Sequence, residues 1–438
     1  MVLHSHRSSI EHLLSLATGL CRVSLSGILG FVGLLAHAAP LTLDDALRLA
    51  QERSRQLPAQ AAAAAAARDM ALAAGQRPDP VLKTGLNSLP VSGADRFSLV
   101  RDNFTMLSVG VSQELTRASK LSARSARFER EAEVAEAGRE LSLANLQRDT
   151  AMAWLDRHYK ERMRDVLGTQ RDEARLQIDA ADASYRSGRG SQADVFAARS
   201  SVAQIEDRIA QTERQIATAT TQLTRWVGAA AVESLGSPPG MDAVRLHAED
   251  LEAQLAHHPQ IAVLAKQEAM AQADADVARA NKQTDVSVEL TYSQRASSYS
   301  NMVSLNLSVP LQWDQKNRQD REVAAKLSVV EQIRAEREEA TRAHLGEALA
   351  MLQEWRSDRD RLTRYDTSLL PLATERTRAS IAAYRGGSGP LTAVLEARRG
   401  EIDTRMERLR LEMDAARLWS QLNYLVPVGH DTPVALRP

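Results

Sequence analysis

One interrupted-helix motif occurs at two distant positions, and this repeat restricts the fold more than any other feature. The first copy reads YRSGRGSQADVFAARS (Tyr185–Ser200), and the second reads YRGGSGPLTAVLEARR (Tyr384–Arg399). Tyr, Arg, two Gly, Val, Ala and Arg recur in the same order. Both copies interrupt sequence rich in Ala, Arg, Glu and Gln, which favours helix. Because glycine ends helices, each copy predicts a turn between two helices of a duplicated chain.

Other segments repeat in the same order. The matched pairs are LDDALRLAQERSRQL (43–57) with AEDLEAQLAHHPQI (248–261), LSVGVSQEL (107–115) with VSLNLSVPL (303–311), and LTRWVG (223–228) with LNYLVP (422–427). GSPPGMD (236–242) separates the halves, and no helix can cross it. We therefore expect a signal peptide (1–39), a first repeat (40–235), a linker (236–242), a second repeat (243–428) and a tail (429–438).

Short strands are predicted at about 80–115 and about 285–311, because apolar and polar residues alternate there with a period of two. The apolar sets are Leu107, Val109 and Val111; Val286, Val288, Leu290 and Tyr292; and Val303, Leu305, Leu307, Val309 and Leu311. A soluble sandwich shows this alternation, and so does a transmembrane barrel with a polar lumen. Four strands are too few to close a barrel, so a barrel would need several copies of the chain.

The helices are predicted to be very long. No proline occurs between Thr116 and Ser184, a stretch of roughly 68 residues that would span on the order of 100 Å as a helix. Apolar or small residues recur at alternating spacings of three and four, which is typical of coiled-coil packing. These stripes are Val202, Ile205, Ile209, Thr212, Ile216, Ala219, Leu223 and Trp226, and then Ile402, Met406, Leu409, Met413 and Ala416.

The N-terminus has the pattern of a secretory signal. An apolar run (23–35) follows two arginines, and AHA (36–38) suits cleavage. The run is too short for a spanning helix. Cys21 is the only cysteine, and Leu20 stands where a lipoprotein signal needs a small residue, so we expect neither lipidation there nor a disulfide.

Several function classes are disfavoured. The formal net charge of −1 gives no field that would attract nucleic acid. Gly188 and Gly190 form a G-x-G, but the third glycine and the preceding strand of a dinucleotide-binding site are missing. The sequence also contains no G-K-[ST] phosphate-binding motif, no H-E-x-x-H or C-x-x-C metal motif and no G-x-S-x-G nucleophile motif. His257 and His258 are expected side by side within a helix, pointing apart. His344 is expected to be hydrogen-bonded between helices. The sequence thus predicts no enzyme, cofactor or metal site.

These residues together resemble the TolC-like outer membrane efflux proteins over about 41–428. The resemblance is carried by the LTLDDALRLA start, the paired strands, the duplication and the turns at Tyr185 and Tyr384. It implies a mainly α fold with a small β part. Duplicated helix-strand-strand-helix hairpins would form, in a homotrimer, a 12-stranded outer-membrane β-barrel continuous with a periplasmic α-helical barrel. Residues 77–115 resemble the heavy-metal (CzcC/CusC-like) branch, although some members carry a lipid-anchored cysteine that is not expected here.

The resemblance also implies site residues. In the family the two turns lie at the periplasmic tip, where they close the tunnel and contact the adaptor protein. The positions that match are Tyr185, Arg186, Gly188, Gly190, Asp194, Tyr384, Arg385, Gly387, Gly389 and Glu396. Asp194 and Glu396 would form carboxylate rings that attract cations. Ala393 replaces a second acid, and Gly389 stands where an arginine can serve as a latch.

The predicted function is the outer-membrane channel of a tripartite RND-type efflux system in a Gram-negative bacterium. Its partners would be a periplasmic adaptor (membrane fusion) protein, an inner-membrane RND pump and outer-membrane lipid. The cargo would be heavy-metal cations (copper/silver or cobalt/zinc/cadmium). The alternatives are a drug-efflux or type I secretion exit duct and, in a different class, a structural periplasmic coiled-coil protein.

Overall fold

A computed structural model describes residues 40–245 and 258–427, and the chain from Pro40 onward forms one compact unit. The predicted signal peptide, Cys21, His257, the tail at 429–438 and most of the segment matched at 248–261 lie outside these residues. Two short helices open the first repeat, followed by two strands and two long helices. The elements are α1 (Leu43–Arg53), α2 (Gln56–Ala74), β1 (Val81–Asn87), β2 (Met106–Leu115), α3 (Ala118–Arg186), α4 (Gln192–Val227) and the 3₁₀ helix η1 (Gly228–Val232).

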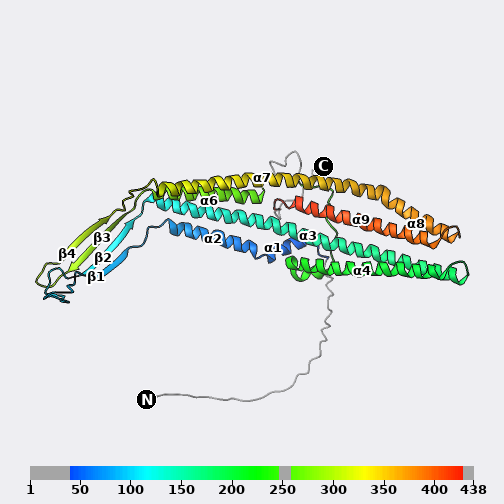
Figure 1. The fold of residues 1–438 in the computed structure, drawn as a ribbon, viewed down its shortest axis with the longest axis horizontal. Coiled ribbons are helices and arrows are strands. Elements are labelled where there is room, and N and C mark those ends of the chain that lie inside the picture. Colours follow the sequence, from blue (N-terminus) through cyan, green and yellow to red (C-terminus); the bar gives the residue numbers. More distant parts are fainter. Residues whose placement is uncertain (1–39, 246–257, 428–438) are drawn as a thin grey trace, which may run out of the picture. The chain divides into compact units, whose positions relative to one another are not determined.

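The second repeat has the same order of helix, two strands and long helices. Its elements are α6 (Pro259–Asn281), β3 (Val286–Gln294), β4 (Met302–Ser308), α7 (Gln319–Arg364), the π-helix η2 (Tyr365–Leu369), α8 (Leu370–Arg385) and α9 (Leu391–Asn423). Within this unit the strands lie at one end of the long helices, and the α3–α4 and α8–α9 turns lie at the opposite end (Figure 1). The predicted fold class is confirmed in these respects.

The four strands form one antiparallel sheet in the order β1-β2-β3-β4. The register places Leu82, Val111, Leu290 and Leu305 in one row across it. Residues on this face are exposed: Leu82 is 68% exposed and Leu305 is 73% exposed. The opposite face carries Ser, Thr, Asn, Lys and Glu side chains. The sheet therefore presents an uncovered apolar face, and β1 and β4 are its two edges.

The helical core has its centre where both repeats meet. Trp154, Leu155 and Tyr159 of α3 are completely buried there, packed with residues of α1, α4, α7 and α9. The indole N–H of Trp154 donates to the carbonyl of Leu41 at 3.0 Å. The coiled-coil stripes predicted from the sequence are buried or half-buried along α4 and α9. Long-range packing of these stripes, more than local propensity, stabilises helices of this length.

Two interruptions differ from the sequence expectation. The opening helix expected over 43–57 is broken at Ser54, whose hydroxyl accepts the N–H of Leu57. The second long helix contains η2 before its glycine turn. Pro371 follows at the first turn of α8 and has no N–H to donate to the carbonyl four residues earlier. A single wider turn accommodates that missing bond.

Candidate functional site

The first helical turn is built by Gly188 and closed by a capping box. Gly188 has φ +70°, and its N–H donates to the carbonyl of Tyr185 at 3.0 Å. Ser191 then starts α4: its hydroxyl accepts the N–H of Asp194, while the Asp194 carboxylate accepts the N–H of Ser191 at 3.0 Å. Gly190 lies against Ser184, where a Cβ would be 2.8 Å from the hydroxyl. Of the five residues predicted for this turn, Gly188 and Gly190 are therefore required by its backbone geometry.

The second turn has the same backbone but a different cap. Gly387 has φ +73° and donates to the carbonyl of Tyr384 at 3.1 Å. Pro390 precedes α9 with no side-chain hydrogen bond to the helix N-terminus. A Cβ on Gly389 would be 3.1 Å from that of Ala383. The two turns are thus duplicated in backbone and unequal in the chemistry of the helix that follows.

Apolar side chains bring the two turns together. Val195 and Ala198 of α4 pack against Leu391 and Val394 of α9, with Ala181 of α3 and the half-buried Tyr384 in the same cluster. Glu396 is exposed on α9, two residues after the buried Val394, and Asp194 is half-buried in its capping box. Arg186 pairs with Asp182 at 2.5 Å, and Tyr185 is 46% exposed. Whether Asp194 and Glu396 face a lumen depends on neighbouring copies and stays a prediction.

Polar links that the sequence did not predict join the hairpin α3–α4 to the hairpin α8–α9. The guanidinium of Arg398, 7% exposed, pairs with Glu173 of α3. Arg208 of α4 donates to Asp403 of α9 at 2.7 Å. Nothing in the linear sequence signalled these contacts, because their partners are roughly two hundred residues apart.

We expect alanine at either of the two turn glycines to destabilise the fold through strain in its own backbone conformation alone. A Cβ at Gly188 or Gly387 would meet no atom within 4 Å, so only the positive φ opposes Gly188→Ala and Gly387→Ala, by about 1 kcal/mol each. Gly346 is equally open but lies inside α7, so Gly346→Ala should stabilise by about 0.5–1 kcal/mol. Thermal unfolding in detergent measures all three, and a gain at either turn would contradict this geometry.

A buried connection joins the sheet to the helices. Lys120 of α3 donates to the carboxylate of Asp285 at 2.6 Å, and the two side chains are 7% and 14% exposed. Asp285 immediately precedes β3 and also accepts the N–H of Arg117 at 3.2 Å. Burial raises the pKa of Asp285, but the hydrogen bonds from Lys120 and Arg117 lower it further, so its pKa lies below the ordinary value. This ion pair joins the start of β3 to the first turn of α3.

Two histidines lie together, contrary to expectation. His258 is the N-cap of α6, and its Nδ1 accepts the N–H of Gln260 at 3.2 Å. It is not inside a helix, because Pro259 starts the helix after it. Its ring stacks on that of His344 of α7, with centroids 4.5 Å apart. His344 also lies 3.4 Å from the Glu347 carboxylate. Its contact between helices is therefore ring stacking on His258.

This pair should make stability depend on pH. Burial, with His344 and Arg148 nearby, lowers the pKa of His258 to about 4. The unfolded chain then binds a proton that the folded chain excludes, so stability falls as pH decreases from about 6.5 to about 4. The loss should reach about 3 kcal/mol. His258→Asn keeps a capping side chain without a titrating group. Unfolding measured across this pH range should lose most of its slope in that variant, and an unchanged slope would contradict the assignment.

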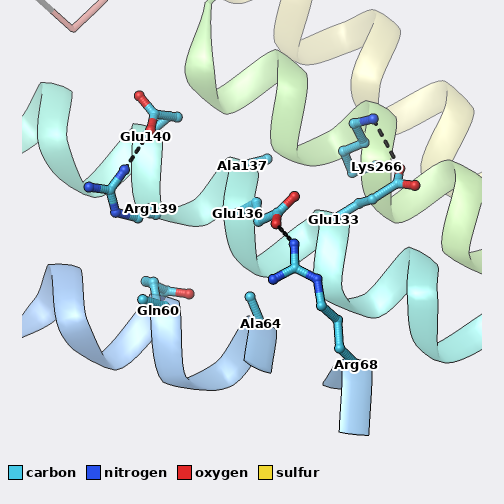
Figure 2. A pocket seen from close by; sticks show the side chains of 10 residues that line it. Gln60, Ala64, Arg68, Glu133, Glu136, Ala137, Arg139, Glu140 and Lys266 are labelled. Atoms are coloured by element: carbon cyan, nitrogen blue, oxygen red, sulfur yellow. Dashed lines mark hydrogen bonds and ion pairs between the residues drawn. The ribbon is translucent and has the colours of Figure 1, made fainter. Parts of the chain in front are cut away.

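A groove of about 500 Å³ lies between α2, α3 and α6 (Figure 2). Its charged side chains neutralise one another in pairs. Arg68 pairs with Glu136, Lys266 with Glu133 at 3.0 Å, and Arg139 with Glu140 at 3.0 Å. Ala64 forms part of its floor. Each charged side chain that lines the groove in the described part of the chain thus has a partner of opposite charge.

Within 40–245 and 258–427, no three His, Cys, Asp or Glu side chains are placed to hold a metal ion together. None of the helices in the described part of the chain is both long and apolar enough to span a membrane.

Comparison with known proteins supports the resemblance read from the sequence. Residues 46–229 match the family described as outer membrane efflux protein. Curated protein sequences give no significant match. The fold is similar to CusC (TM-score 0.72, 15% identity, covering 89% of this chain and 93% of that one). It is equally similar to the outer membrane protein VceC of Vibrio cholerae, with a TM-score of 0.72 and 16% identity, covering 87% of this chain and 95% of that one. The outer-membrane channel OprN also matches, with a TM-score of 0.72 and 15% identity, covering 88% of this chain and 90% of that one. The predicted family resemblance is confirmed over residues 46–229 and the predicted fold over most of the chain, whereas the heavy-metal branch stays a prediction.

Proposed function

We propose that this chain, with the sequence signature of an outer membrane efflux protein in its first half, is the outer-membrane channel of a tripartite RND-type efflux system. One observation carries the proposal: the sheet has an exposed apolar face and a polar opposite face, and it continues directly into a helix of 69 residues. Apolar residues facing lipid and polar residues facing water are what a transmembrane barrel requires. A helix of that length reaches roughly 100 Å into the periplasm.

Three copies would complete the barrel. The outer edges of β1 and β4 have no partner strand among the described residues. Open edges with uncovered apolar faces aggregate unless another strand pairs with them. Pairing β1 of one protomer with β4 of the next, three times, gives a closed 12-stranded barrel. The polar face would then line its lumen, where Lys83 donates to Glu289 at 2.5 Å.

Transport through this channel requires no chemistry of its own. The lumen would be a wet path, and the two glycine turns would form its periplasmic closure. An adaptor protein that binds the turns more tightly in the open arrangement would shift the population toward opening. The links between the two hairpins, such as Arg208–Asp403, are the contacts that such a movement would rearrange.

Glu396 provides the test of the cation-attracting ring. Three exposed carboxylates around the trimer axis would favour cations, so Glu396→Gln should lower the cation selectivity of trimers in planar bilayers. Glu407→Gln is the control, because Glu407 is exposed on the same helix and lies farther from the turn. Equal selectivity in the wild type and in Glu396→Gln would remove Glu396 from the gate. Asp194→Asn tests the first turn, although it also alters the capping box.

Heavy-metal cations are the proposed cargo. Residues 77–115 support this through their resemblance to the heavy-metal branch, and CusC is among the similar folds. OprN and VceC match equally well, so drug efflux and type I secretion remain the alternatives. Deletion of the gene followed by growth on copper, silver, zinc, cobalt and cadmium, and on a dye panel, distinguishes them. Sensitivity to dyes alone would contradict the metal assignment.

A structural periplasmic coiled-coil protein is the alternative of a different class. The apolar sheet face argues against it, since a soluble scaffold would cover that face. A chain lacking residues 1–39 should require detergent to remain in solution. A monodisperse chain without detergent would favour the scaffold.

A further inference from the structure

We propose that the two loops at the far end of the sheet form a docking surface for the phosphate-bearing headgroups of the outer leaflet. The larger loop runs from Ser88 to Thr105 between β1 and β2, and the smaller runs from Arg295 to Asn301 between β3 and β4. The inference rests on the proposed function, since it places these loops at the outer surface of the membrane.

The larger loop has an ordered polar interior. The hydroxyl of Thr105, 2% exposed, donates to the carbonyl of Ser88 at 3.1 Å and closes the two ends of the loop. The carboxylate of Asp102 accepts the N–H of Phe104 and that of Thr105, at 3.0 and 2.9 Å. The Ser98 hydroxyl accepts the N–H of Arg101 at 3.0 Å. These bonds satisfy backbone groups that would otherwise have to face lipid headgroups unpaired.

The outside of the same loop is apolar. Its large exposed side chains are Val91, Phe97, Leu99, Val100 and Phe104, each between 57% and 70% exposed. Phe97 is held at φ +58°, a conformation that bulky residues rarely adopt. A loop that turns its polar groups inward and its apolar groups outward is suited to an apolar environment.

The loop folds toward the apolar face of the sheet. Thr105 precedes Leu107 by two residues, so in extended chain both side chains project to the same face. Loop atoms cover Thr105 on that side, with the carbonyl of Ser98 3.5 Å from its hydroxyl. The apolar surface of the loop therefore continues that of the sheet, at the side where lipid would lie. A loop folded over the pore would cover the polar face instead.

Each loop also places an arginine against an aromatic ring. The guanidinium of Arg96 lies 4.8 Å from the ring centre of Phe97, and that of Arg295 lies 5.0 Å from that of Tyr299. Neither arginine forms an ion pair with the described residues. Arg295 is half-buried and its Nη1 donates to the Sδ of Met302 at 3.4 Å, a neutral partner, so both guanidinium groups lack a counter-charge there. An aromatic ring at the headgroup level with an adjacent free arginine suits the boundary of the membrane, where phosphates lie above acyl chains. A threefold assembly would carry six such pairs around its rim.

The experiment uses trimers of the exported chain. Cys21, the only native cysteine, lies in the expected signal peptide and is replaced by serine so that any uncleaved chain takes no label there. A polarity-sensitive fluorophore is attached to one introduced cysteine at a time, in the variants Leu99→Cys, Leu305→Cys and Ser187→Cys. Each labelled variant is reconstituted in phosphatidylcholine vesicles with or without phosphatidylglycerol. Aqueous iodide and lipids carrying a nitroxide at the headgroup compete as quenchers. Leu305 marks the lipid face, and Ser187, in the first turn, marks water. We expect the label at 99 to resemble that at 305, with strong nitroxide quenching and little iodide quenching.

The arginines are tested by Arg96→Gln and Arg295→Gln, each of which should reduce the preference of the loop for phosphatidylglycerol over phosphatidylcholine by roughly fivefold. Arg376→Gln on α8, far from the sheet, is the matched control. Trimers that conduct but whose label at 99 behaves like that at 187, or is shielded from both quenchers, would overturn the inference and leave the channel intact. If the labels at 99 and at 305 were both quenched by iodide and not by the nitroxide, and no conductance appeared, both the loop inference and the proposed channel function would fail.

Discussion

Replacement of Trp154 by alanine is expected to lower the free energy of unfolding by about 4 kcal/mol, within the range measured for aromatic residues removed from cores. Trp154 is completely buried where α1, α3 and α9 meet. Its ring stacks on that of His158, with centroids 5.4 Å apart. The substitution leaves a cavity and also removes the donor to the Leu41 carbonyl. Both losses act on the junction that holds the N-terminal helix against the long helices.

Trp313→Ala is the matched control for this prediction. Trp313 is 88% exposed, after β4, so its removal in detergent should change stability by less than about 0.5 kcal/mol. Thermal unfolding followed by circular dichroism compares the two variants directly. Similar shifts in both would show that the junction around Trp154 does not contribute to the stability of the fold as described.

Breaking the Lys120–Asp285 pair should have the second-largest effect. Lys120→Met removes the ammonium and leaves a buried carboxylate without its charged partner, at a cost of about 3 kcal/mol near neutral pH. In the double variant Lys120→Met/Asp285→Asn no charge remains buried, so most of that loss should be recovered. A double variant as unstable as Lys120→Met would contradict the role of the pair.

The pH dependence of this pair has a definite sign. The pKa of Asp285 is lowered in the folded protein, so its contribution is present above the unfolded pKa and is lost as pH falls through the folded pKa. The difference in the free energy of unfolding between wild type and Lys120→Met should therefore become smaller in acid. Unfolding measured at pH 7 and at pH 3 tests this, and a difference that grows in acid would be inconsistent with the pair.

Much of the fold could be predicted because its signals are local and repeated. Alternation along Leu107–Val111 and Val303–Leu307 predicted the strands, and the spacing along Val202–Trp226 predicted the coiled-coil stripe. The two turns were found because Gly188 and Gly387 are needed for a positive φ. In each case the type of residue depends on the backbone conformation at its own position, or on whether its own side chain faces the core, lipid or water.

The contacts that were missed depend on residues distant in sequence. His258 stacks on His344 because the start of α6 lies beside α7, and Lys120 pairs with Asp285 because the start of β3 lies beside α3. The interruption at Tyr365–Leu369 was also missed, although Pro371 signalled it. The capping role of Asp194 could have been read from the spacing of Ser191 and Asp194, which suits a capping box.

The central claim is that three copies of the chain form one conducting channel, and single-channel recording tests it most directly. Purified full-length assemblies are added to a planar lipid bilayer, beside a Leu305→Pro variant that cannot maintain the edge strand β4. In the closed barrel β4 pairs on both sides, so proline at 305 removes a ladder hydrogen bond whichever way that N–H points. We predict stepwise conductance from an assembly of three wild-type chains and none from the variant. Wild-type trimers that insert into the bilayer without conducting ions would contradict the account.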